Sequence, residues 1–104
     1  MDLSQKQWTE QVANQEDAII IDVRTPAEWA EGIIPNAMML DIYSGQEFVD
    51  TLRSLENKDA NYYLYCRSGM RSHQACAYMN ELGFTNTFNL SGGIIQYNGE
   101  IVLP

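Results

Sequence analysis

Two runs of apolar residues stand out along the chain because they are too continuous for an amphipathic helix. Residues 18–24 are rich in β-branched side chains, and residues 61–65 are almost entirely aromatic or aliphatic. This pattern is typical of strands that are covered on both faces of a parallel sheet. Residues 37–42 and 87–90 show the same character over shorter lengths and are further strand candidates.

Between these strands, apolar residues recur at helical spacing, and each such segment follows residues that commonly cap a helix N-terminus. Ser4 with Gln7 forms a capping box in front of a helix that we expect to end near Asn14. Thr25 precedes Pro26 and is followed by Glu28, which predicts a short helix with Thr25 as its N-cap.

Two further helices are predicted later in the chain. Ser44 with Glu47 reads as another capping box, for a helix that runs through Leu55. The segment after residue 69 places apolar side chains on one helical face and ends at Gly83, a favourable residue just past a helix C-terminus.

Strands and helices that alternate at this spacing imply right-handed crossovers. The predicted fold class is therefore α/β, with an open, mostly parallel β-sheet and helices on both faces. The chain has 104 residues without an internal repeat, a linker or a low-complexity stretch, so we expect a single domain over residues 1–104. In such sheets, ligands bind beyond the carboxyl ends of the strands.

The net charge and the number of cysteines exclude several classes of partner and cofactor. The formal net charge is −8, which argues against nucleic acid and anionic membrane surfaces as partners. No segment has the length of a membrane span and no apolar leader precedes the first helix, so a cytoplasmic location is expected. Only Cys66 and Cys76 are present, without zinc spacing, so we expect reduced thiols and neither a metal nor another cofactor.

Several residues that can react or bind an anion lie together where a predicted strand meets a predicted helix. They form the segment Cys66-Arg67-Ser68-Gly69-Met70-Arg71-Ser72. A loop at such a junction can turn backbone N–H groups inward, and the helix N-terminus adds positive potential. Both effects, with nearby arginines, lower a cysteine pKa and favour the thiolate. Arg24, Arg67 and Arg71 are half of the six basic residues, which suits a small anionic substrate.

Four segments together resemble the single-domain rhodaneses, a family of sulfurtransferases, over nearly the whole chain. The cysteine loop is similar to the active loop of that family. The other three similar segments, in chain order, are Asp22-Val23-Arg24-Thr25-Pro26-Ala27-Glu28-Trp29, Gly32-Ile33-Ile34-Pro35-Asn36-Ala37 and Asn89-Leu90-Ser91-Gly92-Gly93. Ile33, Asn36 and Tyr97 depart from the pattern, at positions where the family often has His, Gly and an aromatic residue that is commonly Trp.

The resemblance implies a rhodanese-like fold and a thiosulfate sulfurtransferase-type activity. Cys66 would take sulfane sulfur from a small anionic donor such as thiosulfate, hold it as a persulfide and pass it to cyanide, a cellular thiol or a protein. The remaining loop residues and one strand-end arginine would form the substrate site: Arg67, Ser68, Gly69, Met70, Arg71, Ser72 and Arg24. Asp22 is read as structural support, and the oligomeric state stays open.

The sequence allows two alternative roles for several residues of the predicted site. Arg67 either contacts substrate or is solvated, and Arg24 belongs either to the scaffold or to the substrate site. Arg71 either braces the loop, through carbonyl groups or Asp22, or contacts substrate. His73 is an exposed helix residue or a general base, although a loop-activated thiolate needs no base. Cys76 is expected to fill the core.

Two other functions compete with sulfur transfer. The first is a small phosphatase or arsenate reductase with a related cysteine loop, but Arg71 follows Cys66 one residue too early for the tyrosine-phosphatase spacing. A shorter loop makes a smaller cradle, suited to one sulfur atom. The second is a non-catalytic rhodanese-like interaction module, a class that often lacks the cysteine.

Overall fold

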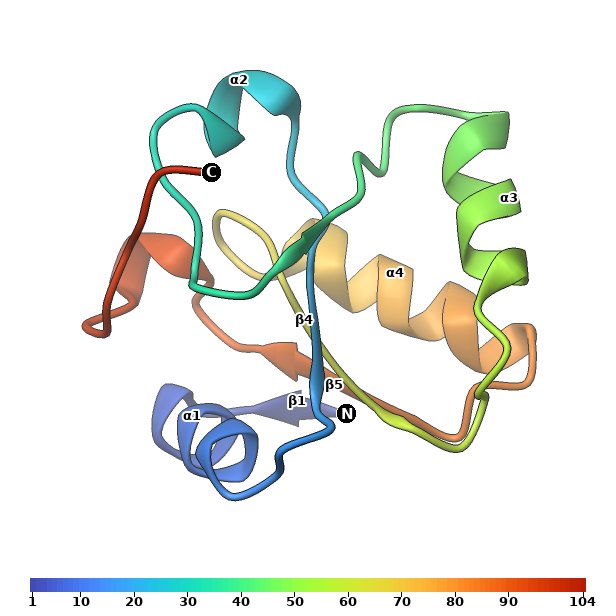
Figure 1. Cartoon of the computed structure of the whole chain (residues 1–104), viewed down its shortest axis with the longest axis horizontal. Helices are drawn as coiled ribbons and strands as arrows, with labels where there is room; N and C mark the ends of the chain where they lie inside the picture. The colour runs from blue at the N-terminus through green and yellow to red at the C-terminus, as the bar shows by residue number, and fades with distance from the viewer.

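Five parallel strands form one sheet in the computed structural model, which describes all 104 residues. The sheet order is β1-β5-β4-β2-β3, and Figure 1 labels β1, β5 and β4 of this sheet. The strands are β1 (Asp2–Leu3), β2 (Ile19–Asp22), β3 (Met38–Met39), β4 (Asn61–Tyr65) and β5 (Asn86–Leu90). The helices are α1 (Gln5–Ala13), α2 (Pro26–Trp29), α3 (Gln46–Ser54) and α4 (Met70–Glu81), followed by the 3₁₀ helix η1 (Ile94–Gln96). This arrangement confirms the predicted α/β class with a parallel sheet.

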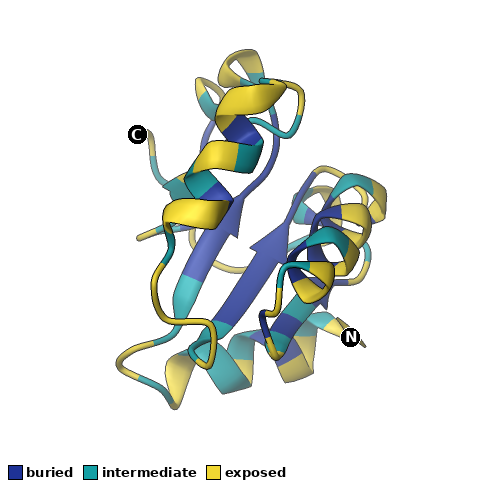
Figure 2. Ribbon diagram, turned by 90° about the vertical axis from the view of Figure 1, so that its right-hand side faces the viewer, coloured by how far each residue is buried: buried dark blue, intermediate teal, exposed yellow.

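The place of β4 at the centre of the sheet explains why its last four residues, 62–65, are aromatic or aliphatic. Tyr62 and Leu64 belong to the core that α3 and α4 cover, whereas Tyr63 and Tyr65 belong to the core on the opposite face, with Trp8 of α1. All four side chains are buried, because side chains of a strand alternate between two covered faces. Figure 2 shows the strands buried while the helices keep an exposed outer surface.

β2 ends two residues before the predicted boundary for a local reason. The backbone N–H of Arg24 donates to the Asp22 carboxylate over 3.0 Å instead of to a neighbouring strand. This side-chain bond turns the chain out of the sheet and into the segment that leads to α2.

The helix starts agree with the predictions in two places and differ in one. Ser4 forms the predicted capping box with Gln7, and Thr25 donates through its N–H and hydroxyl to Glu28. The predicted capping box of Ser44 is wrong, because the Ser44 hydroxyl donates to the Asp41 carbonyl oxygen within a turn. Gly45, with φ of 64°, is the N-cap of α3 instead.

The structure also contains elements that the apolar pattern did not predict. β1 is two residues long, too short for any periodicity, and pairs with the end of β5. The C-terminal segment packs back on the domain, where Val102 and Ile33 exchange two backbone hydrogen bonds of 2.8 and 2.9 Å. Each of the helices is too short or too polar to span a lipid bilayer.

Candidate functional site

Cys66 lies directly after β4, at the edge of the sheet where the parallel strands end. Asp22 of β2 is in register with Tyr65 of β4, so the segments that follow both strands leave the sheet side by side. Ser91 and Gly92 follow β5 at the same edge. Parallel topology therefore brings three of the predicted segments to one place, although they are far apart in sequence.

The sulfur atom of Cys66 is held by donors from its own loop and from the first turn of α4. The Gly69 N–H donates to Sγ over 3.1 Å, and the Ser72 Oγ lies 3.2 Å from Sγ. Burial raises the pKa of the Cys66 thiol, but the Ser72 hydroxyl and the backbone N–H groups of Ser72, Gly69 and Ser68 outweigh it and hold that pKa below its ordinary value. The side chain is fully buried, so these donors replace the water that would otherwise solvate a thiolate.

Cys76 shows the opposite environment. It is buried in α4 within the apolar core, and burial raises the pKa of its thiol to about 11. A thiol with this pKa is protonated at neutral pH and is a poor nucleophile. The two thiols therefore differ in environment, since hydrogen-bond donors lower the pKa of Cys66 and burial raises that of Cys76; the reactivity of Cys66 stays a prediction.

The cysteine loop rests on the segment after β5. Ile94 N–H donates to the Cys66 carbonyl oxygen over 2.9 Å, and Ile95 N–H donates to the Arg67 carbonyl oxygen over 3.1 Å. This close approach needs Gly93, because a Cβ atom there would overlap the backbone of Arg67 and Ser68. Gly69, with φ of 104°, gives the loop its turn into α4, as its position in the motif indicated.

We expect Gly93→Ala to displace the cysteine loop, because the overlap involves backbone atoms that cannot turn aside. The cost is about 1–3 kcal/mol of the free energy of unfolding, and the pKa of Cys66 should rise as its donors move. Urea denaturation and ultraviolet titration of the thiolate measure the two effects.

Gly92→Ala is the matched control for Gly93→Ala. Its φ of 83° is similarly unfavourable for alanine, but its Cβ would meet only the Gln96 side chain, which can rotate. If Gly92→Ala raises the Cys66 pKa as much as Gly93→Ala does, close backbone packing is not what holds the loop.

Arg24 and Asp22 form a buried ion pair at the end of β2. The guanidinium donates to both carboxylate oxygens, with Nη2 at 2.8 Å from Oδ2, and Nη2 also donates to the Gly32 carbonyl oxygen over 2.7 Å. The exposed fractions of the two side chains are 6% and 0%. Asp22 thus has a structural role, and Arg24 is engaged with the scaffold; a contact between Arg24 and substrate stays a prediction.

Arg71 pairs with Glu28 and not with Asp22, the side-chain partner suggested by the sequence. Its guanidinium makes two hydrogen bonds to the carboxylate of Glu28 in α2, at 2.7 and 2.9 Å, while Arg24 already occupies Asp22. The pair ties α2 to the first turn of α4 beside the loop. Arg71 therefore braces the site, and it also lies over the ring of Tyr43 at 5.8 Å from the ring centre.

The Glu28–Arg71 pair predicts an acid-sensitive contribution to stability. The hydrogen bonds from Arg71 lower the pKa of Glu28 from 4.5 to about 2. A lowered carboxyl pKa means that the unfolded state binds the proton more readily. The contribution is thus complete above about pH 4.5 and is lost as the pH falls towards 2.

Urea denaturation of wild type and Glu28→Gln across this pH range tests the prediction. The wild type should lose more of its free energy of unfolding on acidification than the variant does. Glu31→Gln, at an exposed neighbouring position, should follow the wild type. Equal slopes for wild type and Glu28→Gln would contradict the assignment.

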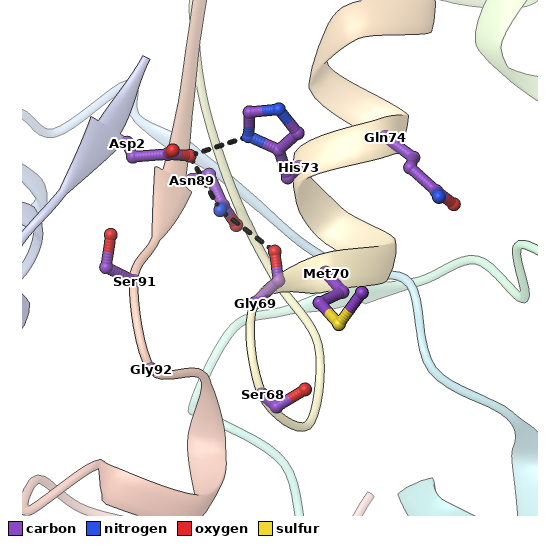
Figure 3. Close-up of a pocket in the computed structure, with 9 residues that line it drawn as sticks. All are labelled: Asp2, Ser68, Gly69, Met70, His73, Gln74, Asn89, Ser91 and Gly92. Carbon is purple, nitrogen blue, oxygen red and sulfur yellow. Dashed lines mark hydrogen bonds and ion pairs between the residues drawn. The ribbon is translucent and has the colours of Figure 1, made fainter.

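The remaining loop residues line the outer surface of the site. Arg67, Ser68 and Met70 are exposed, and Met70 keeps 73% of its surface accessible. Ser68, Gly69 and Met70 border a cleft of about 360 Å³, whose other residues come from β1, α4, β5 and the segment after β5: Asp2, His73, Gln74, Asn89, Ser91 and Gly92 (Figure 3). Arg67 lies on the other side, with Arg24, Glu28 and Glu31. Contacts of Arg67, Ser68 and Met70 with substrate stay predictions.

His73 does not reach the sulfur atom through any hydrogen bond. Its Nδ1 lies 3.0 Å from Asp2 Oδ1, and both side chains are about half exposed or more. The structure gives it a place on the cleft wall and no contact with Cys66, which agrees with the reading that the thiolate needs no base. No group of three or more His, Cys, Asp and Glu side chains is arranged to hold a metal ion.

Asn89 lies beside the site and has contacts that its place in the last similar segment did not predict. Its Oδ1 accepts from the Ser72 hydroxyl, and its Nδ2 donates to Asp2 and to the Gly69 carbonyl oxygen. It is 3% exposed and, like Thr87, is a polar residue on the core face of β5. The sequence does contain one indication of this role, a polar residue within a predicted buried strand just before a glycine-rich turn. Such a residue needs hydrogen-bond partners, because buried polar groups are rarely left without them.

Comparison with known proteins agrees with this arrangement. Residues 5–100 match the family described as rhodanese-like domain. A sulfurtransferase of Allochromatium vinosum is 38% identical over 96 residues, which cover 92% of this chain and 86% of that protein. The putative sulfurtransferase YtwF of Bacillus subtilis is 41% identical over 91 residues, covering 88% and 84% of the two chains.

A solved structure shows the same architecture. The crystal structure of a rhodanese-like domain protein from Staphylococcus aureus superposes with a TM-score of 0.84 at 28% identity, over 99% of this chain and 97% of that chain. The similarity therefore extends over the whole sheet and its helices as well as over the cysteine loop.

Proposed function

The chain belongs to the family of rhodanese-like domains, and on this premise we propose that it transfers sulfane sulfur through a persulfide on Cys66. The observation that carries the proposal is the environment of the Cys66 sulfur, which is buried yet receives hydrogen bonds from the Gly69 N–H and the Ser72 hydroxyl. These donors stabilise a negative charge on sulfur at a site from which bulk water is excluded.

The reaction consists of two displacements. The Cys66 thiolate attacks the outer sulfur of a donor such as thiosulfate, the S–S bond of the donor breaks, and its electron pair leaves with sulfite. The enzyme then carries a persulfide whose charge lies on the outer sulfur. An acceptor nucleophile, such as cyanide or a thiolate, attacks that outer sulfur and returns Cys66 as the thiolate.

Two features support a small sulfur donor over a phosphate or arsenate group. The loop contains four residues between Cys66 and Arg71, and the Arg71 guanidinium is held in its ion pair with Glu28. An arginine committed to a carboxylate is not free to clamp a tetrahedral oxyanion in the loop. Arg67, which is exposed within the loop, is the cation available to attract a small anionic donor.

Intact-protein mass spectrometry tests the proposal. Wild type treated with thiosulfate should gain one sulfur atom, and cyanide should remove it. Mapping of the added sulfur to the peptide that contains Cys66, and not to Cys76, supports the assignment. If the protein gains no sulfur from thiosulfate or from a persulfide donor, the proposal is wrong, and release of phosphate from aryl phosphates or reduction of arsenate should be measured next.

A further inference from the structure

The Ser72 hydroxyl has one proton and two acceptors within reach. Its oxygen lies 3.2 Å from Cys66 Sγ and is also hydrogen bonded to Asn89 Oδ1. All three residues are buried, with exposed fractions of 0%, 0% and 3% for Ser72, Cys66 and Asn89. Because a serine hydroxyl carries a single proton, it can donate to only one of them at a time.

The orientation of the Asn89 amide is fixed by its other contacts. Nδ2 donates to Asp2 Oδ1 over 2.9 Å and to the Gly69 carbonyl oxygen over 3.0 Å, as the dashed lines in Figure 3 show. Both partners only accept hydrogen bonds, so a rotated amide would place its oxygen against two acceptors. Oδ1 therefore faces Ser72, where it competes with sulfur for the hydroxyl proton.

The outcome of this competition depends on the state of the sulfur atom. With Cys66 as a thiol, the S–H can donate to Ser72 Oγ while the Ser72 O–H donates to Asn89, and every group has a partner. With Cys66 as a thiolate, the hydroxyl must turn to the sulfur, and Asn89 Oδ1 loses its buried donor. An unmet buried acceptor is costly, so Asn89 opposes this rotation.

Formation of the persulfide removes the competition between Cys66 Sγ and Asn89 Oδ1 for the Ser72 hydroxyl proton. In the persulfide, Sγ has a second covalent bond and the negative charge has moved to the outer sulfur, so Sγ is a weak acceptor. The Ser72 proton remains on its oxygen throughout, and only the direction of the O–H bond changes. The hydroxyl is then free to donate to Asn89 again.

We propose that Asn89 is a positioning residue for sulfur loading: its Oδ1 competes with the free thiolate for the Ser72 hydroxyl proton and accepts that proton's hydrogen bond without competition once the persulfide forms. The inference rests on the proposed persulfide chemistry. Its consequence is a thiolate that is less stabilised, and hence more nucleophilic, than one that holds Ser72 without competition.

A double-mutant cycle tests the competition on the free protein, without any sulfur donor. The pKa of Cys66 is measured by ultraviolet titration of the thiolate in wild type, Asn89→Leu, Ser72→Ala and the double variant, with circular dichroism as the check on folding. Asn89→Leu should lower the Cys66 pKa by about one unit more when Ser72 is present than when it is absent, because the contested bond is charge-assisted.

The cycle separates positioning from a structural role. If loss of the Nδ2 contacts loosens the loop, the pKa changes in both backgrounds and the change cancels from the difference. The surrounding charged side chains are the same in all four proteins and cancel likewise: Asp2, Asp22, Arg24, Glu28, Arg67, Arg71 and His73. An equal effect of Asn89→Leu in both backgrounds would overturn the inference.

Asn89→Asp provides a second variant for the case in which leucine is not tolerated. It keeps a stronger acceptor towards Ser72, so the part of its pKa effect that depends on Ser72 should have the opposite sign, an additional increase. A coupling of zero or of the same sign as for leucine would contradict the competition.

Sulfur loading is the second readout. At fixed thiosulfate and sulfite concentrations and at a pH where Cys66 is ionised, the ratio of persulfide to free thiolate should fall about tenfold in Asn89→Leu, matching one pKa unit. If wild type takes up no sulfur, the proposed function fails and the loading role fails with it. If wild type loads normally and Asn89→Leu loads equally well, only the inference about Asn89 is wrong.

Discussion

Cys66→Ala is expected to abolish sulfur transfer, with a loss of more than about a thousandfold, because the displaced sulfur then has no atom to which it can bond. No other group near the loop can replace the thiolate. Ser72 is an alcohol whose proton is shared with buried partners, and Cys76 lies inside the core with a raised pKa. Thiocyanate formation from thiosulfate and cyanide measures the loss.

Cys76→Ala is the matched control, because it removes the same atom from a position in the core. Burial raises the pKa of the Cys76 thiol to about 11, so this residue should contribute packing only. The variant should retain most of the activity and lose about 1 kcal/mol of stability for the small cavity. Loss of activity in Cys76→Ala with an unchanged circular dichroism spectrum would show that the second thiol takes part in the reaction.

Arg24→Ala should produce the largest loss of stability of any single charge removal in this protein. The substitution leaves the Asp22 carboxylate fully buried without its cation, and also removes a donor from the Gly32 carbonyl oxygen. Breaking a buried ion pair in this way typically costs about 3–5 kcal/mol of the free energy of unfolding. Urea denaturation at neutral pH measures the change.

Arg71→Ala tests whether burial is the reason for that loss. Its ion pair with Glu28 has equally good geometry, but the side chains are 19% and 21% exposed. Water can therefore solvate Glu28 once Arg71 is removed, and the expected loss is about 1 kcal/mol. If Arg24→Ala costs no more than Arg71→Ala, the Asp22 carboxylate is not the uncompensated charge that the structure indicates.

Activity measurements on folded Arg24→Ala address the role that the sequence left open. A scaffold residue should affect sulfur transfer only through stability, so the activity below the unfolding transition should stay close to that of wild type. An increase in the KM for thiosulfate would instead indicate that Arg24 reaches the donor.

Local chemistry explains which parts of the fold were predictable. The β-branched run before Asp22 and the aromatic run before Cys66 predict buried strands, since both faces of each strand need apolar side chains. The Ser4 capping box is satisfied within four residues of chain. The failure at Ser44 has the same local origin, because a serine can also bond a turn carbonyl, here that of Asp41.

The candidate site was predictable to the same extent. A cysteine followed by a glycine-containing loop and a helix places donors around its sulfur by local geometry, and the contacts from Gly69 and Ser72 confirm this expectation. The contrast with Cys76 follows from its helical position in the core. The partners of these groups beyond the loop were not predictable in the same way.

The succession of the longer strands and helices and the loop around the Cys66 sulfur follow from the sequence alone, because they depend on residues a few positions apart, and the reactivity of Cys66 stays a prediction. The fold is needed to show that Glu28 holds Arg71 across 43 positions and that Asn89 joins Asp2 to Ser72. Competing partners of equal chemistry exist along the chain for each of these groups. The order of strands in the sheet selects among them, since it determines which side chains meet at the edge where the strands end.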